Sequence, residues 1–421
     1  MEEQKWITSN PDFHRIMDDF VNVVGNSELE QEFYKYALNY KKSAHILTNH
    51  LFESSPNIRK LDTYFFSVAY LYRHSLELIL KSIGFKYITG MDDRKFFVKD
   101  TFHNLSSVLD VITPYIDSFI NGDIAAYNWL VSLFDDMSLI DKESDSFRYP
   151  FGITVVKDDD PFSEKPKQYA IKPFIEKQTH IDLVAFANKM EIAFDILNSY
   201  YFESVQIKDY YKKYRPILLE EGGSYYGQSV LGYSYSRNRF SPFVESYTES
   251  AKCLLDFVAD NKSEKETLLF PICYLYRNAI ELALKEILFE ESSYDYQSAL
   301  RKISKSKHKI LGLWNSIKGD IGRHANAPEN DSNLNNAEKY INQLNDFDSA
   351  ADKFRYPTNK YLELHFKKAK KLDINNVAEF FGQLAYFLQG VCLMMSHQND
   401  MQAEMEAEYR EESDDYYSDY Y

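Results

Sequence analysis

Four polar residues are spaced along one apolar segment so that they share one face of a helix. They are Tyr70, Arg73, Glu77 and Lys81, at positions i, i+3, i+7 and i+11. Arg and Glu inside an apolar helix cost several kcal/mol of stability unless they are paired and hydrogen-bonded. This stripe therefore needs polar partners from elsewhere in the chain.

The same four residue types recur 204 residues later as a second stripe, made of Tyr274, Arg277, Glu281 and Lys285. Three more polar residues accompany each stripe. They are a His that opens an apolar helix, the Arg of a Phe-Arg-Tyr-Pro motif, and an acid three residues before that Arg. In the first half they are His103, Arg148 and Asp145, and in the second half His308, Arg355 and Asp352. We predict that they are the partners of the two stripes.

Three interpretations fit this set of residues. One is a polar cleft for phosphodiester chemistry, in which arginines bind phosphate and His or Glu transfers a proton. Another is a structural brace, in which Arg73 and Glu77 form an i,i+4 pair that Arg148 joins. The third is binding of a nucleotide or peptide without catalysis. Under the first interpretation, the candidate catalytic residues are Arg73, Glu77, His103, Arg148, Arg277, Glu281, His308 and Arg355.

The stripes belong to a longer internal repeat. YLYRHSLELILKSI (70–83) recurs as YLYRNAIELALKEI (274–287), with nine identities in fourteen positions. Matching pairs before and after it keep the same order, ending with a helix that opens at Ile181 in one copy and at Ile374 in the other. Repeats of this kind predict a duplicated architecture. We place the copies at about 30–202 and 241–397.

Each copy has the pattern of packed helices. The segment 67–85 is apolar almost all round, which is typical of a central helix buried by its neighbours. The segments that follow His103 and Ile181 show i, i+3, i+4 apolar spacing. With only 14 Gly and 12 Pro in 421 residues, the composition opposes turn-dense β architectures. We predict an all-α protein of two tandem up-and-down bundles, with four to five helices each, related by a pseudo-two-fold duplication and packed as an intrachain pseudo-dimer.

Three segments lie outside the copies. Residues 1–29 are predicted to be an N-terminal helical extension. Residues 203–240 form a Tyr- and Gly-rich basic linker, and 398–421 form an acidic Tyr-rich tail, which we predict to be disordered. The tail holds nine acids and one Arg between Asp400 and Tyr421. A basic protein partner, or a basic site of the chain itself, is an alternative role for it.

The linker combines cations with aromatic faces, which suits single-stranded nucleic acid. Its alternative role is to pack between the bundles through its tyrosines. Under the first role, the candidate nucleic-acid-binding residues are Lys212, Lys213, Arg215, Arg237 and Arg239.

Composition excludes several other classes. The three cysteines contain no C-x-x-C pair, so neither a disulfide framework nor a zinc ribbon is indicated, and we expect no metal or cofactor. The first residues hold no apolar signal region, and the most apolar window (377–395) contains Glu379, Gln383 and Gln389, which favours a buried helix over a bilayer span. We expect a cytoplasmic protein. The net charge, 48 − 64 = −16, disfavours sequence-blind binding of phosphate backbones.

The order YRHxxELxLK, HxLxxLW, D-x-FRYP, followed by a helix, resembles bacterial HEPN-like proteins and covers both copies. The resemblance implies helical bundles linked to phage defence, toxin–antitoxin pairs or RNA cleavage. It predicts a defence or toxin-type protein acting on RNA or a nucleotide. The alternative is a non-catalytic interaction or scaffold protein in which the shared residues are braces.

The resemblance leaves enzymatic activity open. Catalytic HEPN ribonucleases carry R-x(4–6)-H and usually act across a dimer interface. Arg73 and Arg277 have no His at that spacing. Arg301 and His308 do fit it, but the first copy has no equivalent pair. If the chain is an enzyme, the resemblance predicts an RNA endonuclease.

Overall fold

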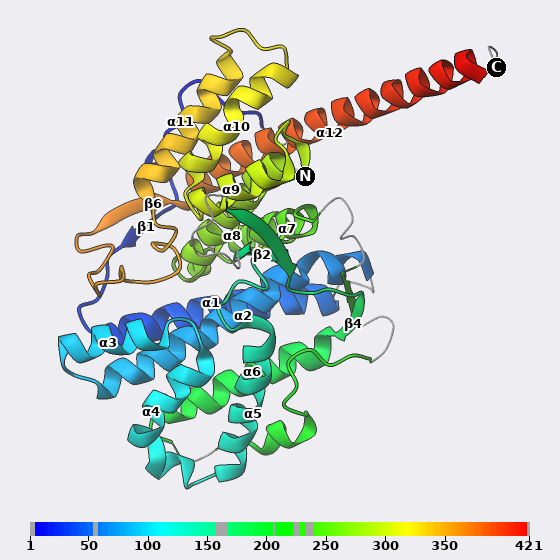
Figure 1. The fold of residues 1–421 in the computed structure, drawn as a ribbon. Coiled ribbons are helices and arrows are strands. Elements are labelled where there is room, and N and C mark those ends of the chain that lie inside the picture. Colours follow the sequence, from blue (N-terminus) through cyan, green and yellow to red (C-terminus); the bar gives the residue numbers. More distant parts are fainter. Residues whose placement is uncertain are drawn as a thin grey trace.

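The computed structural model describes residues 5–53, 58–156, 167–204, 207–222, 228–232 and 239–418. Helices dominate these residues, as predicted (Figure 1). The first half (30–202) holds α1 Leu29–Glu53, α2 Ile58–Tyr87, α3 Met91–Thr101, α4 Leu105–Ile120, α5 Ile124–Asp141 and α6 Leu183–Tyr201. The second half (241–397) holds α7 Ser241–Asp260, α8 Lys265–Glu286, α9 Tyr296–Ser306, α10 Ile310–His324, α11 Ser332–Phe347 and α12 Ile374–Ser418. Each half thus has six described α-helices, more than the four or five predicted.

The two stripe-bearing helices occupy the interior. Helix α2 packs on α1, α4, α6 and α7, and α8 packs on α1, α7, α10 and α12. Because neighbours cover them on every side, apolar residues can occupy all of their faces. Contacts such as α1 on α8 and α2 on α7 join the two halves directly (Figure 1).

Six short strands form three antiparallel pairs in the described part of the chain. Strands β2 (Phe151–Val156) and β3 (Gln168–Pro173) form a hairpin within the first half. Each of the other two pairs joins a strand within one half to a strand that precedes the first helix of the other half. In one, β1 (Phe20–Val23), which precedes α1, pairs with β6 (Lys370–Asp373), which precedes α12.

The remaining pair repeats this arrangement with the halves exchanged. Strand β5 (Gln228–Leu231) precedes α7 and pairs with β4 (Thr179–Asp182), which precedes α6. Ile181 therefore lies in a strand instead of opening a helix, and Asp182 caps α6 by accepting a hydrogen bond from the Ala185 amide. In both pairs, a strand that precedes the first helix of one half thus pairs with a strand of the other half.

The prediction of a helical extension at residues 1–29 is wrong for its described part. Residues 5–28 contain β1 and irregular backbone. Their amides are used in tertiary contacts, because Met17 and Asp19 donate to the Asp373 carboxylate. The Phe13 ring packs against Phe347 of the second half. These contacts outweigh local helix propensity.

The prediction of a disordered tail at 398–421 is also wrong for its described part. Helix α12 continues to Ser418 and projects from the body of the protein (Figure 1). The residues after Gly390 include no Gly or Pro and many Ala, Glu, Gln and Met, which favour helix. Glu406 adds i,i+4 contacts with Gln402 at 3.1 Å and with Arg410 at 3.9 Å.

The apolar part of α12 belongs to the core. Among the described helices, α12 is the one long and apolar enough to cross a membrane by length and composition, and 44% of its most apolar window is buried within the fold. Phe381 is buried and stacks on Tyr276 of α8, with ring centroids 5.8 Å apart. Val377 and Met395, which bound the predicted buried helix, are also fully buried.

Candidate functional site

A fully buried carboxylate stands at the centre of the first stripe. Oε1 of Glu77 accepts hydrogen bonds from Lys81 Nζ at 2.7 Å and from the Tyr356 hydroxyl at 2.8 Å, and lies 2.9 Å from His103 Nδ1. Oε2 accepts from Arg73. Four side chains therefore converge on this carboxylate, and we call the five residues the first cluster.

The second stripe repeats this arrangement around Glu281. Oε1 of Glu281 accepts from Lys285 at 2.7 Å and from the Tyr149 hydroxyl at 2.8 Å, and lies 3.0 Å from His308 Nδ1. Oε2 accepts from Arg277. We call these five residues the second cluster. The prediction that both stripes are buried is confirmed, since Glu77 and Glu281 have no exposed surface.

The arginines of the stripes contact protein groups on several sides, although Nε of each is buried without a hydrogen-bond partner among the described residues. Arg73 donates to Glu77 and to the backbone oxygen of His103, and its Nε lies 3.1 Å from Asp141 at the end of α5. Arg73 is 1% exposed. In the second half, the matching partners of Arg277 are Glu281, His308 and Asp348. Each arginine thus ties its stripe to the loop that carries the histidine.

The tyrosine of each cluster comes from the opposite half. Tyr149 lies in the FRYP motif of the first half but contacts Glu281, and Tyr356 lies in that of the second half but contacts Glu77. The motif backbones are held across the same boundary. Tyr247 donates to the backbone oxygen of Phe147 at 3.0 Å. Each FRYP segment therefore completes the other half's cluster.

This exchange corrects the prediction that Arg148 joins the Arg73–Glu77 pair. Arg148 donates to the hydroxyl of Tyr149 at 2.8 Å and lies 3.3 Å from Asp145. Its motif crosses to the second half, so it cannot also bond the first stripe's carboxylate.

Arg355 takes the corresponding position in the other motif. It donates to the hydroxyls of Tyr70 at 3.0 Å and of Tyr356 at 3.3 Å. Arg148 and Arg355 thus reach the two clusters through tyrosine hydroxyls.

The stripe tyrosines meet where the halves join. The rings of Tyr70 and Tyr274 stack with centroids 4.7 Å apart. The guanidinium carbon of Arg148 lies 5.9 Å from the ring centroid of Tyr70, and that of Arg355 lies 5.9 Å from that of Tyr274. These contacts connect the two clusters through the interior.

The histidines are partly exposed members of the clusters. The side chains of His103 and His308 are 31% and 41% exposed. Burial lowers the pKa of His103 below its ordinary value, against the opposing effect of Glu77. Glu281 raises the pKa of His308, but burial together with Arg148 and Lys285 outweighs it, so this pKa is also lowered. Both imidazoles are therefore neutral near pH 7.

The cluster carboxylates are ionised. Burial raises the pKa of Glu77, but Lys81, His103 and Arg73 outweigh burial and hold the pKa well below its usual range. The pKa of Glu281 is lowered in the same way by its own cationic neighbours. A neutral imidazole oriented at Nδ1 by an ionised carboxylate is the arrangement of a general base.

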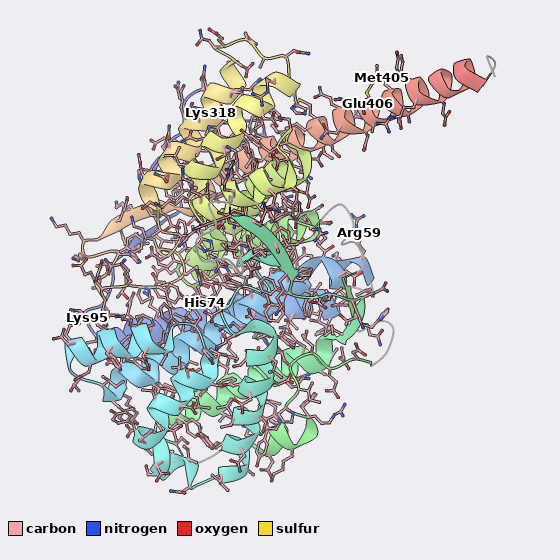
Figure 2. The ribbon with its side chains drawn as sticks, in the orientation of Figure 1. Arg59, His74, Lys95, Lys318, Met405 and Glu406 are labelled. Atoms are coloured by element: carbon pink, nitrogen blue, oxygen red, sulfur yellow. The ribbon has the colours of Figure 1, made fainter. Side chains whose placement is uncertain are left out.

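One position distinguishes the halves. His74 follows Arg73 and is fully buried in the interior (Figure 2), with Nε2 3.0 Å from the backbone oxygen of Arg355. Burial holds its pKa well below the ordinary value. The second half has Asn278 at this position, also buried.

Two of the linker cations predicted to bind nucleic acid form ion pairs with nearby acidic residues. Lys212 lies 2.8 Å from Asp209 within a 3-10 helix at Asp209–Lys213. Arg215 lies 2.5 Å from Glu220. The side chains of Lys212 and Arg215 are 58% and 71% exposed.

The other linker cations are placed differently. Lys213 lies 5.3 Å from the ring centroid of the exposed Tyr210. Arg239 donates its backbone amide to Glu290. Arg237 lies outside the described residues. None of these contacts of the four described linker cations involves a residue of the two clusters.

Sequence reasoning missed six residues of the clusters and their supports. Lys81 and Lys285 belong to the stripes, and Tyr149 and Tyr356 to the FRYP motifs, but none was a candidate site residue. Asp141 and Asp348 were not considered, although each stands four residues before the motif acid, in DKESDSFRYP and DSAADKFRYP. That shared spacing is the signal that identifies them.

Among the described residues, no group of three or more His, Cys, Asp or Glu side chains is placed to hold a metal ion. Comparisons of the chain with family models, with curated proteins and with solved structures find no match.

Proposed function

We propose that the chain is a cytoplasmic tandem HEPN-like protein of the defence or toxin type, whose two bundles form an intrachain pseudo-dimer that acts on RNA or a nucleotide. The proposal is supported by the repeated motifs, by the FRYP segments that the halves exchange, by the two matching strand pairs, and by the matching hydrogen bonds of the two clusters. An exchange of this kind is what a duplicated homodimer would retain.

The observation that carries the proposed chemistry is the half-exposed histidine in each cluster. Nδ1 of His103 faces Glu77 and lies 3.2 Å from the Tyr356 hydroxyl. This leaves Nε2 as the ring nitrogen for a proton from a 2′-hydroxyl or from water. His103 also lies two residues before α4 begins, where the positive end of the helix dipole favours an anionic substrate.

In this proposal the arginines have a different role from the one expected from the sequence. Arg73 and Arg277 hold protein oxygens and do not bind phosphate. They are positioning residues that fix the backbone of His103 and His308. The histidines are the groups that meet the substrate.

The test uses the full chain with total RNA and, separately, with nucleoside triphosphates. His103→Gln with His308→Gln should abolish turnover at a temperature where circular dichroism shows the variant folded, although its unfolding temperature should fall, because each histidine also contacts a buried carboxylate. His45→Gln is the matched control, since His45 is 53% exposed and contacts Glu191. Turnover by the double variant equal to that of the parent would contradict the proposal.

A second candidate is a non-catalytic interaction or scaffold protein, favoured by the several protein groups that contact the buried Arg73 and Glu77. Such a network holds two halves in one arrangement. The absence of turnover by the parent chain under varied metal conditions would support this candidate.

A further inference from the structure

The last turns of α12 leave the body of the protein. Asn399 is anchored there, because its side-chain amide donates to the backbone oxygen of Glu291 at 3.0 Å and its Oδ1 lies 3.3 Å from Nε2 of His324. Every residue from Asp400 to Glu411 is exposed, and the helix runs on to Ser418. At 1.5 Å per residue this projection is roughly 28 Å long (Figure 1).

The projection carries an apolar stripe. Met401, Met405 and Tyr409 recur every fourth residue and are 49%, 66% and 75% exposed. They line one surface together with Gln402 and Glu406; Figure 2 labels Met405 and Glu406 on the projection. A single helix without packing is only marginally stable in water, and methionine suits an apolar surface that receives a partner. The stripe therefore lacks the cover that would stabilise the projection.

The charges around the stripe select the partner. Glu404 and Glu408 lie beside it on one flank and Glu406 on the other, by the angular spacing of a helix. From Asp400 to the end of the chain there are nine acids against one Arg. Two such helices side by side would place like charges together, which disfavours a second copy of this chain.

We propose that Met401, Met405 and Tyr409 form a docking surface for an amphipathic helix of another protein, one whose apolar stripe is bordered by Lys and Arg. The partner's apolar side chains cover the methionines, and its cations meet the flanking glutamates. This helix-against-helix mode needs an apolar seam for affinity and complementary flanks for specificity. The surface is separate from the histidine clusters, so it does not depend on the proposed chemistry.

The experiment uses the full chain and two synthetic helical peptides with the same Leu stripe, one flanked by Lys and the other by Glu. Fluorescence anisotropy should show binding of the Lys peptide and not of the Glu peptide. Met401→Gln with Met405→Gln should weaken binding at least about tenfold, without loss of helix by circular dichroism, because Gln and Met have similar helix propensity. Ala403→Gln with Ala407→Gln, on the opposite face, is the matched control and should bind like the parent.

Each of three outcomes would overturn the proposal. Equal binding of the Lys peptide by the methionine variant would show attraction by charge alone. Equal binding of the Lys peptide and the Glu peptide would show that the surface does not select a cationic partner. Sedimentation showing a dimer of the parent chain that the methionine substitutions dissolve would identify a second copy as the occupant.

Discussion

The hydroxyl of Tyr356 donates a 2.8 Å hydrogen bond to the Glu77 carboxylate, although the two residues are 279 positions apart. Tyr149 and Glu281 make the same contact, also at 2.8 Å, with the halves exchanged. Each buried carboxylate is thus completed by the half that does not contain it. Separating the halves would remove one donor from each of two buried charges, which is costly in an interior of low dielectric.

Replacing Glu77 with Gln should destabilise the protein by about 3–5 kcal/mol, because it leaves the buried Lys81 without its anion and Arg73 with Asp141 as its remaining acid. The measurement is thermal or urea unfolding of the full chain at pH 7. Glu338→Gln is the surface control, since the side chains of Lys318 (labelled in Figure 2) and Glu338 are 42% and 32% exposed, and it should cost less than about 1 kcal/mol. Equal costs would show that the network contributes no more than a surface pair.

Replacing Tyr356 with Phe should keep the packing and remove one hydrogen bond to a charged group, at a cost of about 1.5–3 kcal/mol. The pKa of His103 should rise, because Glu77 then interacts more strongly with the protonated ring. Histidine proton NMR across pH 5–8 would measure this shift. Tyr361→Phe, at an exposed site after the same motif, should leave the titration of His103 as in the parent. If the pKa of His103 is the same in both variants and the parent, Tyr356 does not affect the charge of the cluster.

The buried His74 should make the fold acid-sensitive. Burial lowers its pKa in the folded state, so below pH about 6.5 the unfolded chain binds a proton that the folded chain does not. Stability should therefore fall with decreasing pH, by up to about 1.4 kcal/mol per pH unit for this group. His74→Asn, which installs the residue of the second half, should make that slope shallower in urea unfolding between pH 7.5 and 5. His45→Asn, an exposed control, should keep the parent's slope, and a His74→Asn slope as steep as the parent's would contradict the prediction.

Glu286 should have the opposite effect on the pH dependence of stability, because its contribution falls as pH rises. Burial, with Glu290 and Glu291 nearby, raises its pKa to about 8. The folded chain keeps this proton where the unfolded chain loses it, so this contribution is present below the unfolded pKa and is lost as pH rises through about 8. Glu286→Gln should therefore exceed the parent's stability at pH 8 by more than about 1 kcal/mol and differ little at pH 5. Glu406→Gln, exposed on α12, should leave the free energy of unfolding unchanged at both pH values. If Glu286→Gln changes the stability by the same amount at pH 5 and at pH 8, the pKa of Glu286 is not raised.

The helices and the buried stripes could be predicted from the sequence because their signals are local. An apolar pattern that surrounds a segment requires cover on all sides, and Arg73 and Glu77 four residues apart are neighbours on any helix. The prediction of a disordered tail was wrong because it followed from the acidic charge, whereas the helix propensity of the residues favours a helix. The strands were missed because β1 and β5 are four residues long and form through pairing with β6 and β4, which lie far away in the sequence.

The sequence alone determined which polar residues must be partnered, since burying Arg277 or Glu281 without a partner is too costly in any fold. Tertiary structure alone decided which half supplies the partner. A repeat has the same residues in both copies, so a tyrosine that completes its own stripe and one that completes the other stripe leave identical patterns in the chain. The path of the backbone between the FRYP motif and the opposite helix makes that choice, and no residue type encodes it locally.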